Sequence, residues 1–263
     1  MEIKMKLAGK KIVITGASCG IGYELAKLAL AKGCKVLGVA RAMAKAEISH
    51  PNFLALDMDI SSPKGVDKVF DYALEHLGEI DIFVANAGYA FYEKLGAPDW
   101  QHYHTAFDLN VFSPFYSAQK MKQLYQKKPY SVLITASAMG YVSLPGYSMY
   151  SASKAALRGF ADAYRYELAK GQKLQVVFPI ATKTDFFRAA GDIPMSWPVQ
   201  SATSVAKKIV RGLERGSANI FPSAIFLFFK VLSAIFPTAL RVYNIRNNNA
   251  FKAWLAEKDT LTD

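Results

Sequence analysis

Short apolar runs alternate with helical patterns along most of this 263-residue chain, and this alternation limits the possible fold more than any other feature. Runs of strand length, rich in Val, Ile, Leu and Phe, fall at 11–15, 35–40, 52–57, 81–85, 130–135, 174–178 and 219–221. Helical patterns fall near 20–32, 62–77, 98–126, 149–170 and 201–215. Strands that are apolar throughout and separated by helices indicate a parallel sheet covered on both faces. We therefore predict one doubly wound α/β domain over residues 1–219, with about seven parallel strands and helices on both faces.

The last part of the chain departs from this pattern. Residues 220–240 contain a single charge, Lys230, and Pro222 and Pro237 enclose a segment expected to be helical. At about 1.5 Å per residue, this helix of about fourteen residues is too short to span a bilayer of roughly 30 Å. Because it is apolar on nearly every side, water alone is a poor environment for it. We predict an apolar C-terminal helical extension over residues 220–263.

The net charge of +11 limits the partners of the chain. A basic protein can bind nucleic acid, an anionic membrane surface or an anionic cofactor. No basic run with interleaved aromatic residues marks a nucleic-acid groove, so we expect no nucleic-acid partner.

His102 and His104 stand apart from any Cys/His/Asp group with zinc spacing, so no metal site is predicted. Two cysteines, Cys19 and Cys34, cannot build a disulfide framework, which favours a reducing compartment. With no apolar signal core at the N-terminus, we expect a cytoplasmic protein, peripheral at most to the inner membrane surface.

A glycine-rich segment joins the first predicted strand to the first predicted helix. It reads Gly16-x-x-x-Gly20-x-Gly22. Glycines allow a backbone to turn sharply and to approach a pyrophosphate, and the N-terminus of a helix offers free N–H groups and the positive end of a dipole. The position between strand and helix therefore favours a dinucleotide site, although the same segment without a ligand would be a tight turn.

A tyrosine and a lysine are one helical turn apart in the fourth predicted helix. Tyr150 and Lys154 therefore lie on one face of that helix. The unperturbed pKa of tyrosine, about 10, is too high for acid–base catalysis at neutral pH, and a nearby ammonium group lowers that pKa by favouring the phenolate. Ser137 lies 13 residues upstream, at the end of the fifth predicted strand. The three side chains predict a proton-transfer site, although a Tyr-x-x-x-Lys pair alone also occurs by chance on helix surfaces.

These segments occur together in an order and at separations that resemble those of the short-chain dehydrogenase/reductase family. The resemblance rests on Thr15-Gly16-x-x-x-Gly20-Ile21-Gly22, Asn86-Ala87-Gly88, Ser137 and Tyr150-x-x-x-Lys154, and it covers residues 10 to about 190. It implies a Rossmann-like sheet, a nicotinamide cofactor and hydride transfer between a carbonyl compound and an alcohol.

The resemblance also implies which residues contact the cofactor. They are Gly16, Ser18, Cys19, Gly20, Ile21, Gly22, Arg41, Asp59, Ile60, Asn86, Ala87, Gly88, Tyr150, Lys154, Pro179 and Thr184. Asp59 would hold the adenine amino group, with Asp57 as the alternative. Family members that prefer NAD have a carboxylate at the end of the second strand, whereas this chain has Arg41, whose guanidinium can pair with a 2′-phosphate. We therefore expect NADP(H), with NADPH preferred over NADH, unless Arg41 is only a solvated surface charge.

Four residues would perform the reaction according to the same resemblance. Tyr150 would donate the proton to the reduced carbonyl, Ser137 would hold the same oxygen, and Lys154 would lower the pKa of Tyr150 and bind the nicotinamide ribose. Asn110 would hold a water that links Lys154 to solvent, or it would simply pack inside its helix. The expected function is the NADP(H)-dependent reduction of a carbonyl to an alcohol, or the reverse. The alternative is a non-catalytic NADP-binding sensor or scaffold of the same fold.

Features around the predicted site bear on its substrate and shape. Aromatic residues expected to ring its mouth together favour an apolar small-molecule substrate, a lipid-like one included, although each alone is more typical of the core or the surface than of a ligand contact; they are Phe91, Tyr92, Tyr141, Tyr147, Phe186, Phe187 and Trp197. Ile180 replaces the glycine that the family usually has after Pro179, so the backbone there must avoid positive φ, and Ile180 could wall off part of the pocket. Only about ten residues separate Arg41 from the third strand, which predicts a truncated second crossover helix.

Three roles remain open for the C-terminal extension. It could form a subunit interface, since members of the family commonly form homodimers or homotetramers. It could cover an apolar substrate as a lid. It could also make a peripheral membrane contact through residues 223–246, where the apolar helix is followed by Arg241 and Arg246, cations suited to anionic headgroups.

Overall fold

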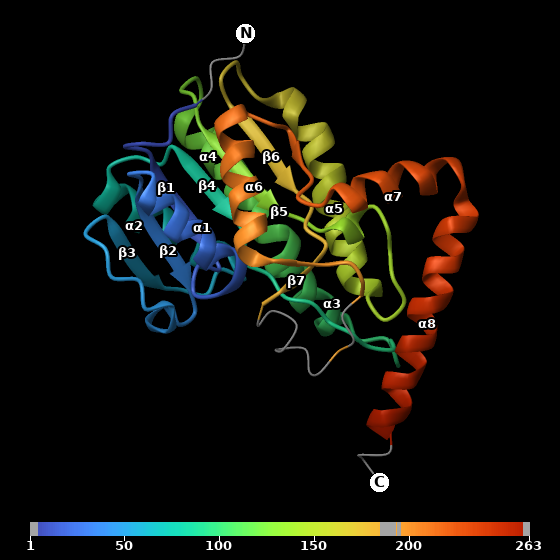
Figure 1. Cartoon of the computed structure of the whole chain (residues 1–263). Coiled ribbons are helices and arrows are strands. Elements are labelled where there is room, and N and C mark those ends of the chain that lie inside the picture. The colour runs from blue at the N-terminus through green and yellow to red at the C-terminus, as the bar shows by residue number, and fades with distance from the viewer. Residues whose placement is uncertain (1–4, 185–192, 194–195, 260–263) are drawn as a thin grey trace.

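The computed structural model describes residues 5–184, 193 and 196–259, and within them it confirms the predicted parallel sheet (Figure 1). Seven strands form this sheet in the order β3-β2-β1-β4-β5-β6-β9, and every neighbouring pair is parallel. Their bounds are β1 Lys11–Thr15, β2 Lys35–Ala40, β3 Phe53–Asp57, β4 Ile82–Ala85, β5 Ser131–Thr135, β6 Lys173–Val177 and β9 Asn219–Ile220. The strand order reverses between β1 and β4, and open α/β sheets bind ligands in the crevice at such a point. Two short strands, β7 (Ala181–Lys183) and β8 (Val199–Ser201), pair separately.

Helices cover both faces of the sheet, as the alternation predicts. They are α1 Gly20–Ala31, α2 Pro63–Leu77, α3 Trp100–Phe107, α4 Ser113–Tyr125, α5 Ser148–Tyr164 and α6 Ala202–Arg215, with 3-10 helices η1 Met43–Ala46, η3 Ala138–Gly140 and η4 Arg165–Glu167. Helices α1 and α6 pack on one face, and α2, α4 and α5 pack on the other. Because side chains alternate along a strand, β1 contributes Val13 to one apolar layer and Ile12 and Ile14 to the other.

Local sequence determines where two of these helices begin and end. The Ser62 hydroxyl accepts a hydrogen bond from a backbone N–H in the first turn of α2, and Pro63 occupies the first position, where its missing N–H costs nothing. Helix α2 ends at Gly78, whose φ is +80°. Helix α6 follows the same rule, with Ser201 as its N-cap and Gly216, at φ +68°, as its C-cap.

Two helical segments bear on the site. The helix predicted over 98–126 is divided, because the π-helix η2 (Asp108–Phe112) separates α3 from α4. Such wide turns occur frequently at functional sites. The crossover between β2 and β3 contains only η1, which confirms its predicted truncation.

The C-terminal extension consists of two helices, α7 (Ala224–Ile235) and α8 (Pro237–Asp259), and α8 turns sharply away from α7 (Figure 1). The helical character of the extension is as predicted, and Pro222 and Pro237 enclose the first of its two helices. Phe226 from α7 and Phe251 and Trp254 from α8 are buried in an apolar cluster with Tyr92 and Tyr147. Among the helices the structure describes, none alone has the length and apolar character needed to cross a membrane. Helix α7 and Leu240–Lys258 meet that requirement only as a pair, by length and composition, and they are bent by 116°.

Candidate active site

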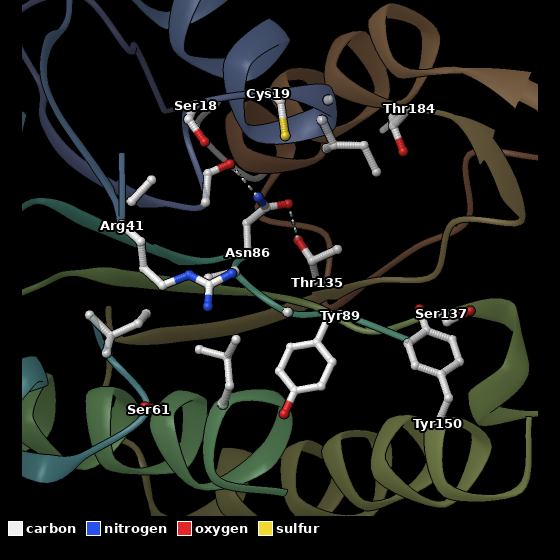
Figure 2. Close-up of a pocket in the computed structure, with 18 of the residues that line it drawn as sticks. Ser18, Cys19, Arg41, Ser61, Asn86, Tyr89, Thr135, Ser137, Tyr150 and Thr184 are labelled. Carbon is white, nitrogen blue, oxygen red and sulfur yellow. Dashed lines mark hydrogen bonds between the residues drawn. The ribbon is translucent and has the colours of Figure 1, made fainter. Parts of the chain in front are cut away.

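A cavity of about 1060 Å³ lies at the carboxyl ends of the strands, where the strand order reverses. Figure 2 shows Arg41 at one end of this cavity, Tyr150 and Ser137 at the other, and Tyr89 between them. All the predicted cofactor and catalytic residues line the cavity except Gly22 and Asn110. The sheet therefore brings together residues from separate parts of the sequence at the place where this fold binds ligands.

Gly22 lies one layer behind the cavity wall. A Cβ atom on Gly22 would lie 2.2 Å from the carbonyl oxygen of Gly16, so no larger residue fits without a shift of the loop. Gly16 and Gly20 have φ angles of +67° and +60°, which glycine adopts at little cost. A Cβ atom on Gly16 would in addition lie 2.9 Å from Cα of Ala87. The loop thus depends on glycine at all three predicted positions.

The N-terminus of α1 adjoins this loop. Cys19 precedes the helix, its side chain makes no capping hydrogen bond, and the first turn of the described helix contains no acidic residue. The first backbone N–H groups are therefore left to bind an anionic ligand. Together with the space that the glycines leave, this arrangement fits the phosphates of a dinucleotide.

Asn86 ties three strands together at the floor of the cavity. Its Nδ2 donates to the carbonyl oxygens of Thr15 (3.0 Å) and Gly16 (3.3 Å), and its Oδ1 accepts from Oγ1 of Thr135 at 3.1 Å. The Thr15 hydroxyl accepts from the backbone N–H groups of Asn86 and Ala87, each at 3.0 Å. The ends of β1, β4 and β5 are thereby held in one arrangement.

Positive charge gathers at the end of the cavity beyond β2. Arg41 directly follows β2, and Lys45 comes from η1; both line the cavity. Lys45 is not among the predicted cofactor residues, because its position depends on the crossover being a single short turn. The glycine loop contributes no cation to the described cavity. Lys45 is therefore the second positively charged side chain, after Arg41, at this end of the cavity.

The two acidic residues near the end of β3 differ in their surroundings. Asp59 lines the cavity, and hydrogen bonds from Ser61 lower its pKa, with a smaller contribution from the charge of Arg41. Asp57 does not line the cavity, and its carboxylate accepts a hydrogen bond from the backbone N–H of Met43 at 2.6 Å. Of the two alternatives, Asp59 is therefore the one available to a ligand.

The three predicted proton-transfer residues meet at the other end of the cavity, and all are buried. The Ser137 hydroxyl accepts a hydrogen bond from the backbone N–H of Met139 at 3.1 Å, and it lies near enough to Tyr150 to favour a lower pKa of that phenol. Lys154 Nζ donates to the carbonyl oxygen of Thr135 at 3.0 Å and lies 5.5 Å from the centre of the Tyr150 ring. Helix α5 therefore brings the pair together as predicted, with β5 supplying their partners.

The predicted lowering of the Tyr150 pKa is wrong for this structure. Burial raises the pKa of Tyr150 to about 12, and the nearby Ser137 hydroxyl opposes that rise without cancelling it. Burial also lowers the pKa of Lys154 to about 8. Both shifts have one cause, since removal from water disfavours the charged form of each group. Tyr150 is thus held firmly in its protonated form.

Asn110 lies within the π-helix and is buried behind the cavity. Its Oδ1 accepts from the backbone N–H of Tyr89 at 3.1 Å, and its Nδ2 donates to the Tyr89 carbonyl at 2.9 Å. A Cβ atom on Gly88 would lie 2.8 Å from the same Oδ1. The side chain of Asn110 therefore fixes the loop after β4, and its predicted water link to Lys154 stays a prediction. Tyr89 itself lines the cavity, which the sequence analysis did not foresee.

The predicted aromatic ring around the mouth is largely wrong. Tyr92 and Tyr147 are buried beneath the C-terminal helices, and Tyr141 packs on Phe178 and Phe221. Phe91 and Trp197 do not line the cavity either, and Phe186 and Phe187 lie outside the described residues. Met139 and Ile180 are the apolar residues that line the cavity near Tyr150. Ile180 avoids positive φ, as predicted.

Comparisons with known proteins show which family the chain belongs to. A family model for short chain dehydrogenases matches residues 10–192. The 3-oxoacyl-[acyl-carrier-protein] reductase FabG of Escherichia coli is 31% identical over 194 residues, 72% of this chain and 80% of that protein. The chain matches between 57% and 80% of the length of its curated relatives.

Solved structures share the fold. A short chain dehydrogenase from Burkholderia cenocepacia in complex with NADP superposes with a TM-score of 0.78 at 22% identity, covering 90% of this chain and 98% of that one. One from Burkholderia phymatum in complex with NAD gives a TM-score of 0.77 at 20% identity, covering 88% and 94%. With the family model matching well over half of its length, the chain belongs to the short-chain dehydrogenase/reductase family of NAD(P)-dependent oxidoreductases.

Proposed function

We propose that this protein is an NADP(H)-dependent oxidoreductase that reduces a carbonyl to an alcohol, or runs the reverse reaction, on an apolar small molecule. The observation that carries the proposal is the buried group of Tyr150, Ser137 and Lys154 at the end of the cavity opposite Arg41. A protonated hydroxyl beside a second hydroxyl and a cation suits a reaction in which a carbonyl oxygen becomes an alkoxide.

In this mechanism the bound nicotinamide supplies the hydride. Ser137 and Tyr150 hold the substrate carbonyl oxygen between their hydroxyls, so that both hydrogen bonds strengthen as negative charge develops there. Tyr150 then donates its proton to that oxygen. The high pKa of Tyr150 does not prevent this step, because an alkoxide is a stronger base than the phenolate it leaves behind. Lys154, when charged, stabilises the phenolate until it is reprotonated.

The preference for NADPH follows from charge at the opposite end. Arg41 and Lys45 would pair with a 2′-phosphate, and the last residue of β2 is Ala40 where an NAD-preferring enzyme has a carboxylate. The glycine loop and the uncapped N-terminus of α1 would hold the pyrophosphate. Gln101, Thr105 and Asp108 line the cavity as well, and so do Met139 and Ile180, which pack in one apolar cluster with Tyr150. This supports an apolar substrate.

The test measures oxidation of NADPH and of NADH with ketones of increasing apolar chain length. We expect turnover that improves with chain length and favours NADPH. Arg41→Ala should lower kcat/KM for NADPH by about 10- to 100-fold, the loss of one charge-assisted hydrogen bond, and leave NADH nearly unchanged. Lys35→Ala, at the opposite end of β2, is the matched control and should change neither. Absence of turnover with every ketone, despite tight NADPH binding, would favour the non-catalytic sensor or scaffold.

The pH profile offers a separate check on Lys154. Below its pKa of about 8 this lysine is charged, and above that pH it is neutral, while Tyr150, with a pKa of about 12, stays protonated throughout. We therefore expect kcat/KM for ketone reduction to be level in mild acid and to fall about tenfold per pH unit above about 8. Lys154→Gln should be slow at every pH and show no such fall. A wild-type profile that stays level through about pH 10, the ordinary pKa of lysine, would contradict the assignment.

The compartment and assembly are proposals of the same kind. Cys19 and Cys34 are both free thiols, which suits the reducing cytoplasm. A homodimer or homotetramer remains the expected assembly.

A further inference from the structure

We infer that the C-terminal helices dock this enzyme in the plane of an anionic lipid surface. Each of the two helices has an inner side that packs on the catalytic domain and an outer side that is exposed. The inner side holds them to the catalytic domain: the Tyr92 ring lies 5.0 Å from that of Phe251 and 4.8 Å from that of Trp254, measured between centroids. Phe226 packs with Tyr141 of the catalytic domain, at 6.4 Å between ring centroids. The extension is therefore packed against the catalytic domain in the described molecule.

The outer side is apolar. We define the outer face by its exposed side chains, which are Ile225, Leu227, Phe228, Val231, Ile235, Phe236, Val242 and Ile245. Phe228, Ile235 and Val242 are 70%, 65% and 68% exposed, values usual for surface lysines rather than for large apolar groups. Contiguous exposed apolar side chains of this size mark an interaction site. Ile225, Phe228, Val231 and Ile235 follow helical spacing, so they form one stripe along α7.

The single charge of α7 is turned away from the outer face. Lys230 Nζ lies 3.9 Å from the centre of the Tyr141 ring of the catalytic domain and 4.8 Å from that of Phe221, so its charge rests on aromatic rings on the inner side of α7. The outer face of α7 therefore carries no charge. A lysine at this position could equally have reached water, and its inward orientation leaves the stripe free to enter an apolar medium.

The charges around the outer face are all positive. No acidic residue occurs between Glu214 and Glu257, whereas Arg241 and Arg246 stand beside Val242 and Ile245 on the exposed side of α8. An apolar stripe flanked by cations is the pattern by which amphipathic helices lie at a lipid surface, and each cation near anionic headgroups contributes about 1 kcal/mol. A second copy of this chain fits less well, because two such faces would bring Arg241 and Arg246 of both copies together with no acid on the face to pair them.

The geometry favours lying on the bilayer over crossing it. Helix α7 has 12 residues, about 18 Å, which is little more than half the hydrocarbon thickness. Helix α8 cannot continue the span, because the pair is bent by 116° and Phe251 and Trp254 are buried against the catalytic domain. This inference does not rest on the proposed reaction, and its test is separate from turnover.

The test is flotation of the full chain with phosphatidylcholine vesicles, with and without phosphatidylglycerol. We expect the protein to float with the anionic vesicles and to be released by high salt. Phe228→Glu with Ile235→Glu should lower vesicle affinity by at least about tenfold, and Arg241→Gln with Arg246→Gln by about 10- to 30-fold, from roughly 1 kcal/mol per cation. Tyr166→Glu, at an exposed aromatic residue on the catalytic domain, is the matched control and should float like the wild type.

Thermal melting of each variant shows whether it is folded, so a lost flotation is read only from folded protein. Equal flotation of wild type and the Phe228→Glu, Ile235→Glu variant would overturn the inference. So would no flotation together with an oligomer that this variant dissociates in size-exclusion chromatography with light scattering, since the occupant would then be a second copy. Resistance to alkaline carbonate extraction would also overturn it, in favour of a broken span.

Discussion

Tyr150→Phe is expected to lower kcat for ketone reduction by about 10³-fold or more, with little change in NADPH affinity. The substitution removes the proton donor, worth about 10²- to 10⁴-fold, and one of the two hydroxyls that would hold the developing alkoxide. Ser137 remains and supplies part of the second effect. The ring is retained, so the packing of Tyr150 in its buried cluster is unchanged. The measurement is single-turnover oxidation of bound NADPH, which separates the chemical step from cofactor binding.

Tyr147→Phe is the control for this experiment. Tyr147 lies at the start of the same helix, its ring centroid is 6.2 Å from that of Tyr150, and it is equally buried, but it does not line the cavity. The same hydroxyl deletion there should leave kcat within a few-fold of the wild type. Equal rates for wild type and Tyr150→Phe would remove Tyr150 from the mechanism and revive the non-catalytic alternative. Equal losses in both variants would point to packing in the cluster.

Gly22→Ala is expected to abolish measurable cofactor binding at ordinary concentrations and to destabilise the fold by several kcal/mol. Its new Cβ would lie 2.2 Å from the Gly16 carbonyl oxygen and 2.7 Å from Nδ2 of Asn86, so the loop and the brace beneath it must both move. Overpacking of this kind costs about 1–3 kcal/mol, and an unpaired buried amide adds about 1–3 kcal/mol. NADPH titration by fluorescence and urea unfolding measure the two effects.

Gly159→Ala serves as the matched helical glycine. It lies in α5 with nothing within 4 Å of its added methyl group, so the substitution should be neutral or stabilise by about 1 kcal/mol. Normal NADPH affinity in Gly22→Ala would show that the loop can rearrange without loss, and would weaken the assignment of this loop to the cofactor.

Much of this molecule could be predicted because the relevant signals are local. The central strands β1, β2, β4, β5 and β6 are short runs of mostly buried residues. The Gly16–Gly22 and Tyr150–Lys154 motifs lie at strand ends or on one helix face, where the fold brings them together. The features that sequence could not predict depend on tertiary packing. Lys45 reaches the cavity only because the crossover is one turn long.

Two errors have the same origin. The pKa of Tyr150 was expected to fall because Lys154 is close, but the extent of burial, which decides the shift, is not visible in a four-residue motif. Tyr92 and Tyr147 are predicted to ring the cavity mouth, but α8, which lies far from both along the chain, packs over them. In both cases the residue is buried by segments that are distant in sequence, so its burial cannot be predicted from the residues next to it in the chain.

The one-turn crossover at Met43–Ala46 also has an evolutionary consequence. The residues that would choose between two nucleotides sit on a separate segment from those that would handle the proton, and no described hydrogen bond joins η1 to α5. Insertions or substitutions in this turn could therefore change the preference between NADPH and NADH without changing the proton-transfer residues. The turn is for this reason a suitable target for engineering the cofactor preference.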